Sequence, residues 1–128
     1  MSTEENKAVI RKYWDELNKG NLAHMDECFA PNFANLRIDG TVMDRDGYKQ
    51  LNATLLKGFP DLHVTVNQMV GEGDDIAFWF TLSGTNLGEL RGSPPTGKRL
   101  TIPEAYFARL ERGKITEFRH FQAERRYE

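Results

Sequence analysis

The first half of the chain carries apolar side chains at helical spacing. Near the N-terminus they recur every three or four positions, at Val9, Ile10, Tyr13, Trp14 and Leu17. This spacing predicts a helix from a capping box at Ser2 to about Lys19, stopped by Gly20. Two further helices are predicted, from Leu22 to Phe29 and from a cap at Asp44 or Asp46 to about Gly58.

The second half alternates between apolar and polar residues, which is typical of strands with one buried face. The predicted strands are Phe33 to Ile38, Leu62 to Val70, Asp75 to Asn86, Lys98 to Leu110 and Lys114 to Arg125. Between the third and fourth of these, the segment 86–98 is rich in Gly and Pro and reads as a long connection. Helices followed by strands predict an α+β fold with three N-terminal helices packed on a curved, mostly antiparallel sheet.

The length and net charge of the chain narrow the possible classes of protein. A chain of 128 residues is expected to form a single domain, residues 1–128. A formal net charge of −2 gives no general attraction to phosphate backbones, so nucleic acid is not an expected partner. No apolar run is long enough to cross a membrane, and the acidic N-terminus lacks the features of a signal peptide, which favours a cytoplasmic protein.

The last two predicted strands carry the side chains that are candidates for acid/base chemistry. Because side chains alternate, Glu104 and Tyr106 share a face of the first strand, and Arg119, Phe121 and Ala123 share a face of the second. If these faces line a cavity, Glu104 and Arg119 are the groups in it that can carry charge. Two interpretations remain open: an acid/base site, or a cross-strand ion pair with no turnover.

The histidines and glycines predict no bound metal or nucleotide. His24 and His63 are expected at the surface, and His120 is expected on the outer sheet face, opposite in parity to Arg119. No two histidines have ligand spacing with a third donor, so no metal site is expected. No Gly-rich loop follows a strand and opens a helix, so no nucleotide cofactor is expected either.

Four stretches together resemble the SnoaL-like polyketide cyclase family of the nuclear-transport-factor-2-like superfamily. They are Asn18-Lys19-Gly20-Asn21-Leu22 with Phe29-Ala30-Pro31-Asn32-Phe33, Gly58-Phe59-Pro60-Asp61-Leu62, Gly84-Thr85 with Gly88-Glu89-Leu90 and Pro94-Pro95-Thr96-Gly97, and Arg109 to Ile115 followed by Glu117. The resemblance implies a cone with an internal pocket, a homodimer formed through the outer sheet face, and cofactor-independent aldol cyclisation of a polyketide. Relatives on this fold include epoxide hydrolases and isomerases.

The residues implied by the resemblance are partly replaced in this chain. The catalytic aspartate of the family falls at Ala123, which cannot transfer a proton. A pocket histidine of the family falls at Tyr106, and its neighbour, often glutamine in the cyclases, falls at Glu104. Asn35 and Arg119 fit positions that are polar in the cyclases. The scaffold therefore resembles the family more closely than the catalytic residues do.

We expect a cyclase-like enzyme of secondary metabolism that acts on a polyketide-like or polycyclic small molecule. Its expected catalytic residues are Glu104 as base, with Tyr106 and Arg119. The expected substrate-binding residues are Tyr13, Trp14, Asn35, Trp79, Phe121 and Ala123. One alternative is a non-catalytic small-molecule-binding protein. Another is an epoxide hydrolase or isomerase, with Asn35, Glu104 and Arg119 around an activated water.

Overall fold

The computed structural model describes residues 1–122 and has four helical elements, of which the first and the last begin at predicted caps. They are α1 (Thr3–Asn18), the 3-10 turn η1 (Leu22–His24), α2 (Met25–Cys28) and α3 (Arg45–Gly58). Ser2 forms the predicted capping box, in which its Oγ accepts from the Glu5 N–H at 3.1 Å. Of the two caps predicted for α3, Asp44 is the one used, because its Oδ1 accepts from the Gly47 N–H at 2.8 Å.

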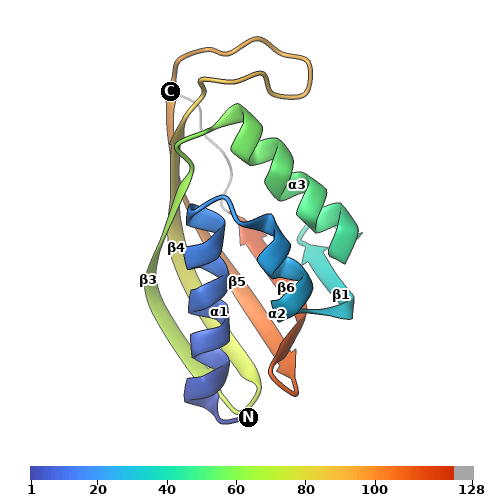
Figure 1. The fold of residues 1–128 in the computed structure, drawn as a ribbon. Helices are drawn as coiled ribbons and strands as arrows, with labels where there is room; N and C mark the ends of the chain where they lie inside the picture. Colours follow the sequence, from blue (N-terminus) through green and yellow to red (C-terminus); the bar gives the residue numbers. More distant parts are fainter. Residues whose placement is uncertain (123–128) are drawn as a thin grey trace.

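Six strands form one sheet in the order β2-β1-β6-β5-β4-β3. They are β1 (Phe29–Arg37), β2 (Val42–Asp44), β3 (His63–Glu72), β4 (Asp75–Thr85), β5 (Arg99–Glu111) and β6 (Lys114–Gln122). Every neighbouring pair is antiparallel except β1 and β6, which run parallel. The helices cover one face of this curved, open sheet, which confirms the predicted α+β fold (Figure 1).

Three elements differ from the prediction, and one of them is β1, which begins at Phe29 and not at the predicted Phe33. The continuous helix expected from Leu22 to Phe29 is instead the short pair η1 and α2, because Phe29 already begins β1. The strand β2 was not predicted, since three residues carry too little of an alternating pattern to be recognised. The last predicted strand extends to Arg125, but residues 123–128 lie outside the described part of the chain.

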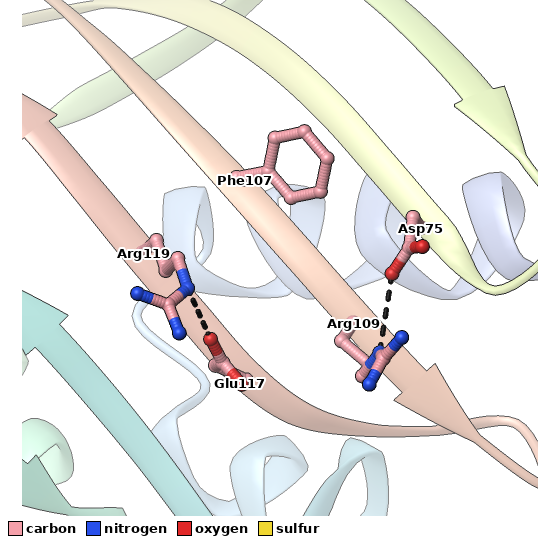
Figure 2. Close-up of a pocket in the computed structure, with 5 residues that line it drawn as sticks. All are labelled: Asp75, Phe107, Arg109, Glu117 and Arg119. Atoms are coloured by element: carbon pink, nitrogen blue, oxygen red, sulfur yellow. Dashed lines mark hydrogen bonds and ion pairs between the residues drawn. The ribbon is translucent and has the colours of Figure 1, made fainter.

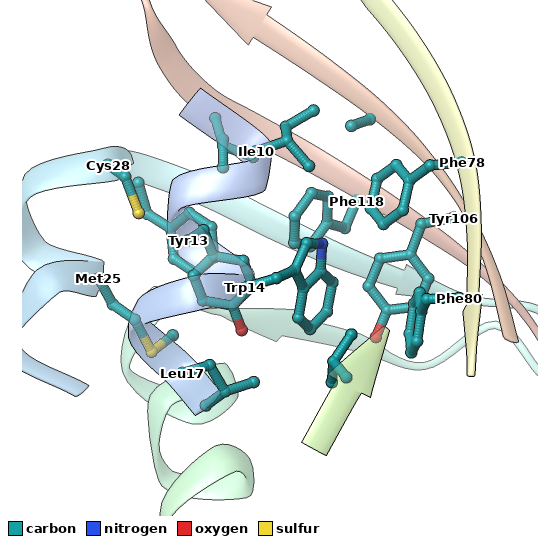
Figure 3. Close-up of a cluster of buried hydrophobic side chains, with 14 of the residues drawn as sticks. Ile10, Tyr13, Trp14, Leu17, Met25, Cys28, Phe78, Phe80, Tyr106 and Phe118 are labelled. Carbon is teal, nitrogen blue, oxygen red and sulfur yellow. The ribbon is translucent and has the colours of Figure 1, made fainter. Parts of the chain in front are cut away.

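The core lies between the helices and the inner face of the sheet. Trp14 of α1 sits among aromatic rings from the sheet, with ring centroids 4.7 Å from Phe80 and 5.7 Å from Tyr106 (Figure 3). On β4, Phe78 and Phe80 point into the core, because alternate side chains of a strand share a face. No helix among residues 1–122 is long and apolar enough to cross a membrane.

A β-bulge in β6 changes which side chains face inward. Arg109 pairs with Glu117, but the next residue, Leu110, pairs with Ile115, so Thr116 is one extra residue on β6. Ile115 is therefore buried before the bulge, and Phe118 and His120 are buried after it. Strict alternation from Ile115 would have turned the opposite set of side chains inward. The predicted inward parity of β6 is wrong for this reason.

Candidate functional site

A large cavity lies between the helices and the inner face of the sheet, with a volume of about 1190 Å³. Its walls come from α1 and α3, from the inner faces of β4, β5 and β6, and from the connection 86–98. The lining includes Trp14, Tyr48, Phe80, Glu104, Tyr106 and His120. A cavity of this size and mixed character is typical of small-molecule sites, which combine apolar walls with a few polar groups.

Glu104, Tyr106 and His120 meet inside this cavity. Tyr106 of β5 and His120 of β6 are direct cross-strand partners, and their ring centroids are 4.5 Å apart. His120 Nε2 lies 3.4 Å from Glu104 Oε2, and both side chains are almost fully buried. This distance is within ion-pair range, yet Nε2 makes no hydrogen bond with a described residue. A carboxylate, an imidazole and a phenol that can all exchange protons therefore share one buried site.

A chain of hydroxyl groups extends from Tyr106 toward the helices. The Tyr106 and Tyr48 hydroxyl oxygens are 3.1 Å apart, and Asn52 Nδ2 donates to the Tyr13 hydroxyl at 2.7 Å. Burial raises the pKa of Tyr106 well above its usual value, and the nearby Glu104 carboxylate raises that pKa further. Burial is also the main reason that the pKa values of Tyr48 and Tyr13 are raised. All three phenols therefore stay protonated at neutral pH and can donate hydrogen bonds.

The predicted location of Arg119 is wrong. The bulge turns Arg119 to the outer face, where its Nε lies 2.6 Å from Glu117 Oε1 (Figure 2). There it lines a separate hollow of about 230 Å³ with Asp75, Phe107, Arg109 and Glu117. The predicted ion pair between Glu104 and Arg119 is therefore not formed. The trio of Asn35, Glu104 and Arg119 is not assembled either.

The aromatic residues predicted to bind substrate divide between the two faces. Trp14 lines the cavity, as predicted. Trp79 and Phe121 lie on the outer face and are 43% and 48% exposed, so their predicted place in the pocket is wrong. Tyr13 is buried behind the cavity wall, where it touches Asn52. Trp79 shares its side of β4 with Thr81, Ser83 and Thr85, and this is the solvent-facing side of the strand.

Asn35 is fully buried on β1, and its amide makes no hydrogen bond with a described residue. It pairs with Phe118 across the parallel strands β1 and β6, so it faces inward, although it is not among the residues that line the cavity. Ala123 lies outside the described residues. The roles predicted for these two residues stay predictions.

Sequence reasoning missed His120 and Arg37. His120 was expected on the outer face, and only the bulge moves it inward. Arg37 is the cross-strand partner of His120 on β1 and lines the same cavity. A signal for Arg37 was available, because it lies two positions after the inward-facing Asn35 on the same strand. His24, also expected at the surface, is buried beside Glu27.

Within residues 1–122, no group of three or more His, Cys, Asp or Glu side chains is placed to hold a metal ion. Cys28 is buried in the core, and burial raises the pKa of its thiol to about 12. A thiol with so high a pKa is a poor nucleophile at neutral pH. Among the described residues, the cavity around Glu104 and His120 is thus the best-supported location for acid/base chemistry.

Comparison with known proteins points to one family. The sequence profile of the SnoaL-like polyketide cyclases matches residues 7–123. A candidate SnoaL-like polyketide cyclase from Jannaschia sp. CCS1 is 26% identical, with a TM-score of 0.82 over 93% of this chain and 85% of that chain. No curated protein matches the sequence.

Two Streptomyces structures are similarly related. AclR, a candidate hydroxylase from Streptomyces galilaeus, is 27% identical, with a TM-score of 0.85 over 94% of this chain and 79% of that chain. IdmH, a candidate polyketide cyclase from Streptomyces antibioticus, is 26% identical, with a TM-score of 0.80 over 91% of this chain and 90% of that chain. One fold thus carries proteins assigned to different reactions, so the reaction of this chain has to be argued from its own residues.

Proposed function

Because the chain belongs to the SnoaL-like polyketide cyclase family, we propose that it is a cofactor-independent enzyme of secondary metabolism that performs aldol-type cyclisation. Its substrate in this proposal is a polyketide-like or other polycyclic carbonyl compound. The observation that carries the proposal is the buried contact between Glu104 and His120, beside Tyr106, in the cavity. The similar solved structures, which include a candidate cyclase and a candidate hydroxylase, support this general class of enzyme.

In the proposed reaction, the Glu104–His120 pair first removes a proton from the carbon next to a substrate carbonyl, with Glu104 as the base. The Tyr106 hydroxyl donates a hydrogen bond to the enolate oxygen that forms. The enolate carbon then bonds to a second carbonyl carbon of the same molecule. The resulting alkoxide takes back one proton from the Glu104–His120 pair, so the product has the mass of the substrate.

His120 gives Glu104 an imidazole neighbour, which the predicted site lacked. With Arg119 on the outer face, Glu104 has an imidazole as its ionisable neighbour, and no guanidinium of residues 1–122 lies within ion-pair distance of it. An imidazole can hold or release a proton near neutral pH, whereas a guanidinium cannot. This exchange of neighbours favours proton transfer over a purely structural ion pair.

The proposal is tested by isotope exchange, which needs no knowledge of the natural substrate. β-Tetralone, a bicyclic aromatic ketone, exchanges its benzylic protons slowly in neutral deuterium oxide, and proton NMR follows the loss of signal. The protein should accelerate this exchange, and Glu104→Gln should reduce the acceleration at least about a hundredfold. Glu117→Gln, which removes a carboxylate from the outer face, is the matched control and should behave as the unaltered protein.

Two outcomes would count against the proposal. An exchange rate with the unaltered protein that equals the buffer rate, combined with binding of the ketone, favours a non-catalytic binding protein. Equal rates for the unaltered protein and Glu104→Gln remove Glu104 from the mechanism. Both outcomes leave the described cavity intact as a ligand site.

We also propose that the chain forms a homodimer through the outer face of the sheet. That face exposes large apolar side chains on adjacent strands, including Val70, Trp79, Phe107 and Phe121. Trp79, Ala105 and Phe121 are direct cross-strand neighbours, which makes a continuous apolar row. The ion pairs Asp75–Arg109 and Glu117–Arg119 lie on the same face, around Phe107 (Figure 2). An apolar patch bordered by charges is typical of a protein interface.

A further inference from the structure

The charges around the cavity are strongly segregated. Over the whole chain, 17 Lys and Arg residues are nearly balanced by 19 Asp and Glu residues. Among residues 1–122, the lining of the cavity nevertheless contains four cationic side chains and a single carboxylate, that of Glu104. The four cations are Arg37, Arg91, Lys98 and Arg99. If charged residues lined the cavity in proportion to this composition, its wall would carry carboxylates and cations in nearly equal numbers.

Three of the four cations are exposed, whereas the carboxylate is buried. Glu104 is 7% exposed and lies beside the core aromatics. Arg91, Lys98 and Arg99 are exposed and come from the connection 86–98 and the start of β5. Arg37, half-buried on β1, is the cross-strand partner of His120 and so belongs with the acid/base pair. The cavity is thus positively charged where it opens to solvent and carries its acid/base pair inside.

No carboxylate among residues 1–122 lies within ion-pair distance of these four cations. Arg37 slightly lowers the pKa of Asp39, and Arg99 slightly lowers the pKa of Asp61. The main cause of both lowered pKa values is hydrogen bonding from Thr41 and Thr85, respectively. Those two carboxylates are therefore already satisfied by other donors. The positive charge of the cavity mouth remains uncompensated within the described chain.

The connection that carries Arg91 and Lys98 is held in place by Asn86. This buried side chain donates to the Gly58 and Gly88 carbonyl oxygens at 3.1 and 2.9 Å. Its Oδ1 accepts from the Thr96 N–H at 2.9 Å, and its backbone N–H donates to the Lys98 carbonyl at 2.9 Å. A Cβ at Gly88 would lie only 2.0 Å from the Lys57 carbonyl oxygen, so the connection packs closely against the end of α3. The cations are therefore presented by a fixed loop.

We propose that the substrate of this cavity carries an oxyanion group, a carboxylate or a phosphate, which Arg91, Lys98 and Arg99 hold at the mouth while the apolar body reaches Glu104. This inference names the substrate class of the site and rests on the proposed function. The separation of charge gives the ligand one orientation, because an anionic end is repelled by the Glu104 carboxylate and attracted by the mouth. Arg37 lies where it can meet an anion of a deeper-seated ligand or the enolate itself.

The test uses three naphthalene probes of one shape: naphthoate, its methyl ester and naphthyl phosphate. Isothermal titration calorimetry at low salt should show that at least one of the two anions binds about tenfold more tightly than the ester. Replacing Arg91, Lys98 and Arg99 with Gln together should remove this preference. The matched control replaces Arg109, Arg112 and Lys114 with Gln, which deletes the same charge around the turn between β5 and β6 and should keep it.

Each result either indicates which oxyanion group the substrate carries or overturns the inference. Stronger binding of naphthoate indicates a free acid, and stronger binding of naphthyl phosphate indicates a phosphate ester. Equal or weaker binding of both anions relative to the ester, or no binding of either anion, overturns the inference. A preference that survives the triple substitution at the mouth overturns it as well.

The same titration with Glu104→Gln separates this inference from the proposed function. That variant should bind the anions at least as tightly as the unaltered protein, because it lacks the one carboxylate of the lining. Anion preference without any isotope exchange contradicts only the proposed chemistry. Isotope exchange without anion preference contradicts only the inference about the substrate.

Discussion

Glu104 is the residue whose position most needs a functional explanation. Its side chain is 5% exposed, and the ionisable group in contact with it is His120. Burying a carboxylate is unfavourable unless it is paired, whereas Gln keeps the size of Glu without its charge, and a neutral imidazole beside it needs no charged partner. We therefore predict that Glu104→Gln keeps Tm within about 3 °C of the unaltered protein or raises it. A fall of 10 °C or so in a calorimetric scan would instead mean that Glu104 holds the fold together.

Tyr106 and Tyr48 allow a matched test of the proposed oxyanion donor. Either substitution to Phe breaks the same hydroxyl contact of 3.1 Å and should reduce the free energy of unfolding by about 1 kcal/mol. Only Tyr106→Phe removes the hydroxyl next to Glu104 and His120, so it should slow isotope exchange about a hundredfold. Tyr48→Phe should slow exchange far less. Equal losses in both variants would assign the effect to packing alone.

The buried tyrosines predict how stability depends on pH. Burial raises the pKa of Tyr13, Tyr48 and Tyr106 in the folded protein well above the value near 10 of an exposed tyrosine. Their contribution to stability is fully present below pH 10 or so, and it is lost as the pH rises toward the folded-state values. Absorbance titration should therefore show three of the four tyrosines ionising only together with unfolding. Ionisation near pH 10 in a protein that retains its far-ultraviolet circular dichroism would contradict this.

At the scale of elements, α3 depends on its N-cap. The exposed Asp44 side chain accepts from the Gly47 N–H, whereas no hydrogen bond to a described residue involves the side chain of Asp46 in the first turn. Asp44→Ala should lower the free energy of unfolding by about 1 kcal/mol, because a helix N–H loses its acceptor. Asp46→Ala is the control and should change it by less than half as much. Urea unfolding measures both, and equal effects would contradict the assignment of the cap.

Strand β6 shows where sequence reasoning succeeded and where it failed. The alternation of Ile102, Glu104, Tyr106 and Ala108 predicted the inward face of β5 correctly, because β5 pairs with β4 without a register shift. On β6 the same rule placed Arg119 inward and His120 outward, because nothing in the sequence marks Thr116 as the extra residue of a bulge. Glu104 was therefore found from the sequence, while its partner His120 required the structure.

At the scale of the whole molecule, the outer sheet face predicts assembly. Phe107 lies near the centre of that face and is 45% exposed. Phe107→Lys should convert a dimer into a monomer, because two lysines would be buried without partners in a symmetric interface. Ile38→Lys changes an exposed apolar residue in the β1–β2 turn and should leave the dimer intact. Light scattering coupled to size exclusion measures the mass, and an unchanged mass for Phe107→Lys would rule out this face.

The overall arrangement was largely predictable, whereas the polarity of the cavity was not. Helical spacing followed by strand alternation predicted three helices on a mostly antiparallel sheet. The cations of the cavity come from β1, from the connection 86–98 and from the start of β5, and β1 is distant in sequence from the other two. Glycines and prolines marked that connection as a loop, but they gave no sign that Arg91 and Lys98 would face the same space as His120.

The most direct test of the account is a double-mutant cycle on the isotope exchange of β-tetralone. Glu104→Gln, His120→Gln and the double variant are compared with the unaltered protein under identical conditions. If Glu104 and His120 act as one acid/base pair, the double variant should be no slower than the slower single variant. Multiplicative losses, or a single variant that retains the full rate, would contradict the claim that these two side chains work as a unit.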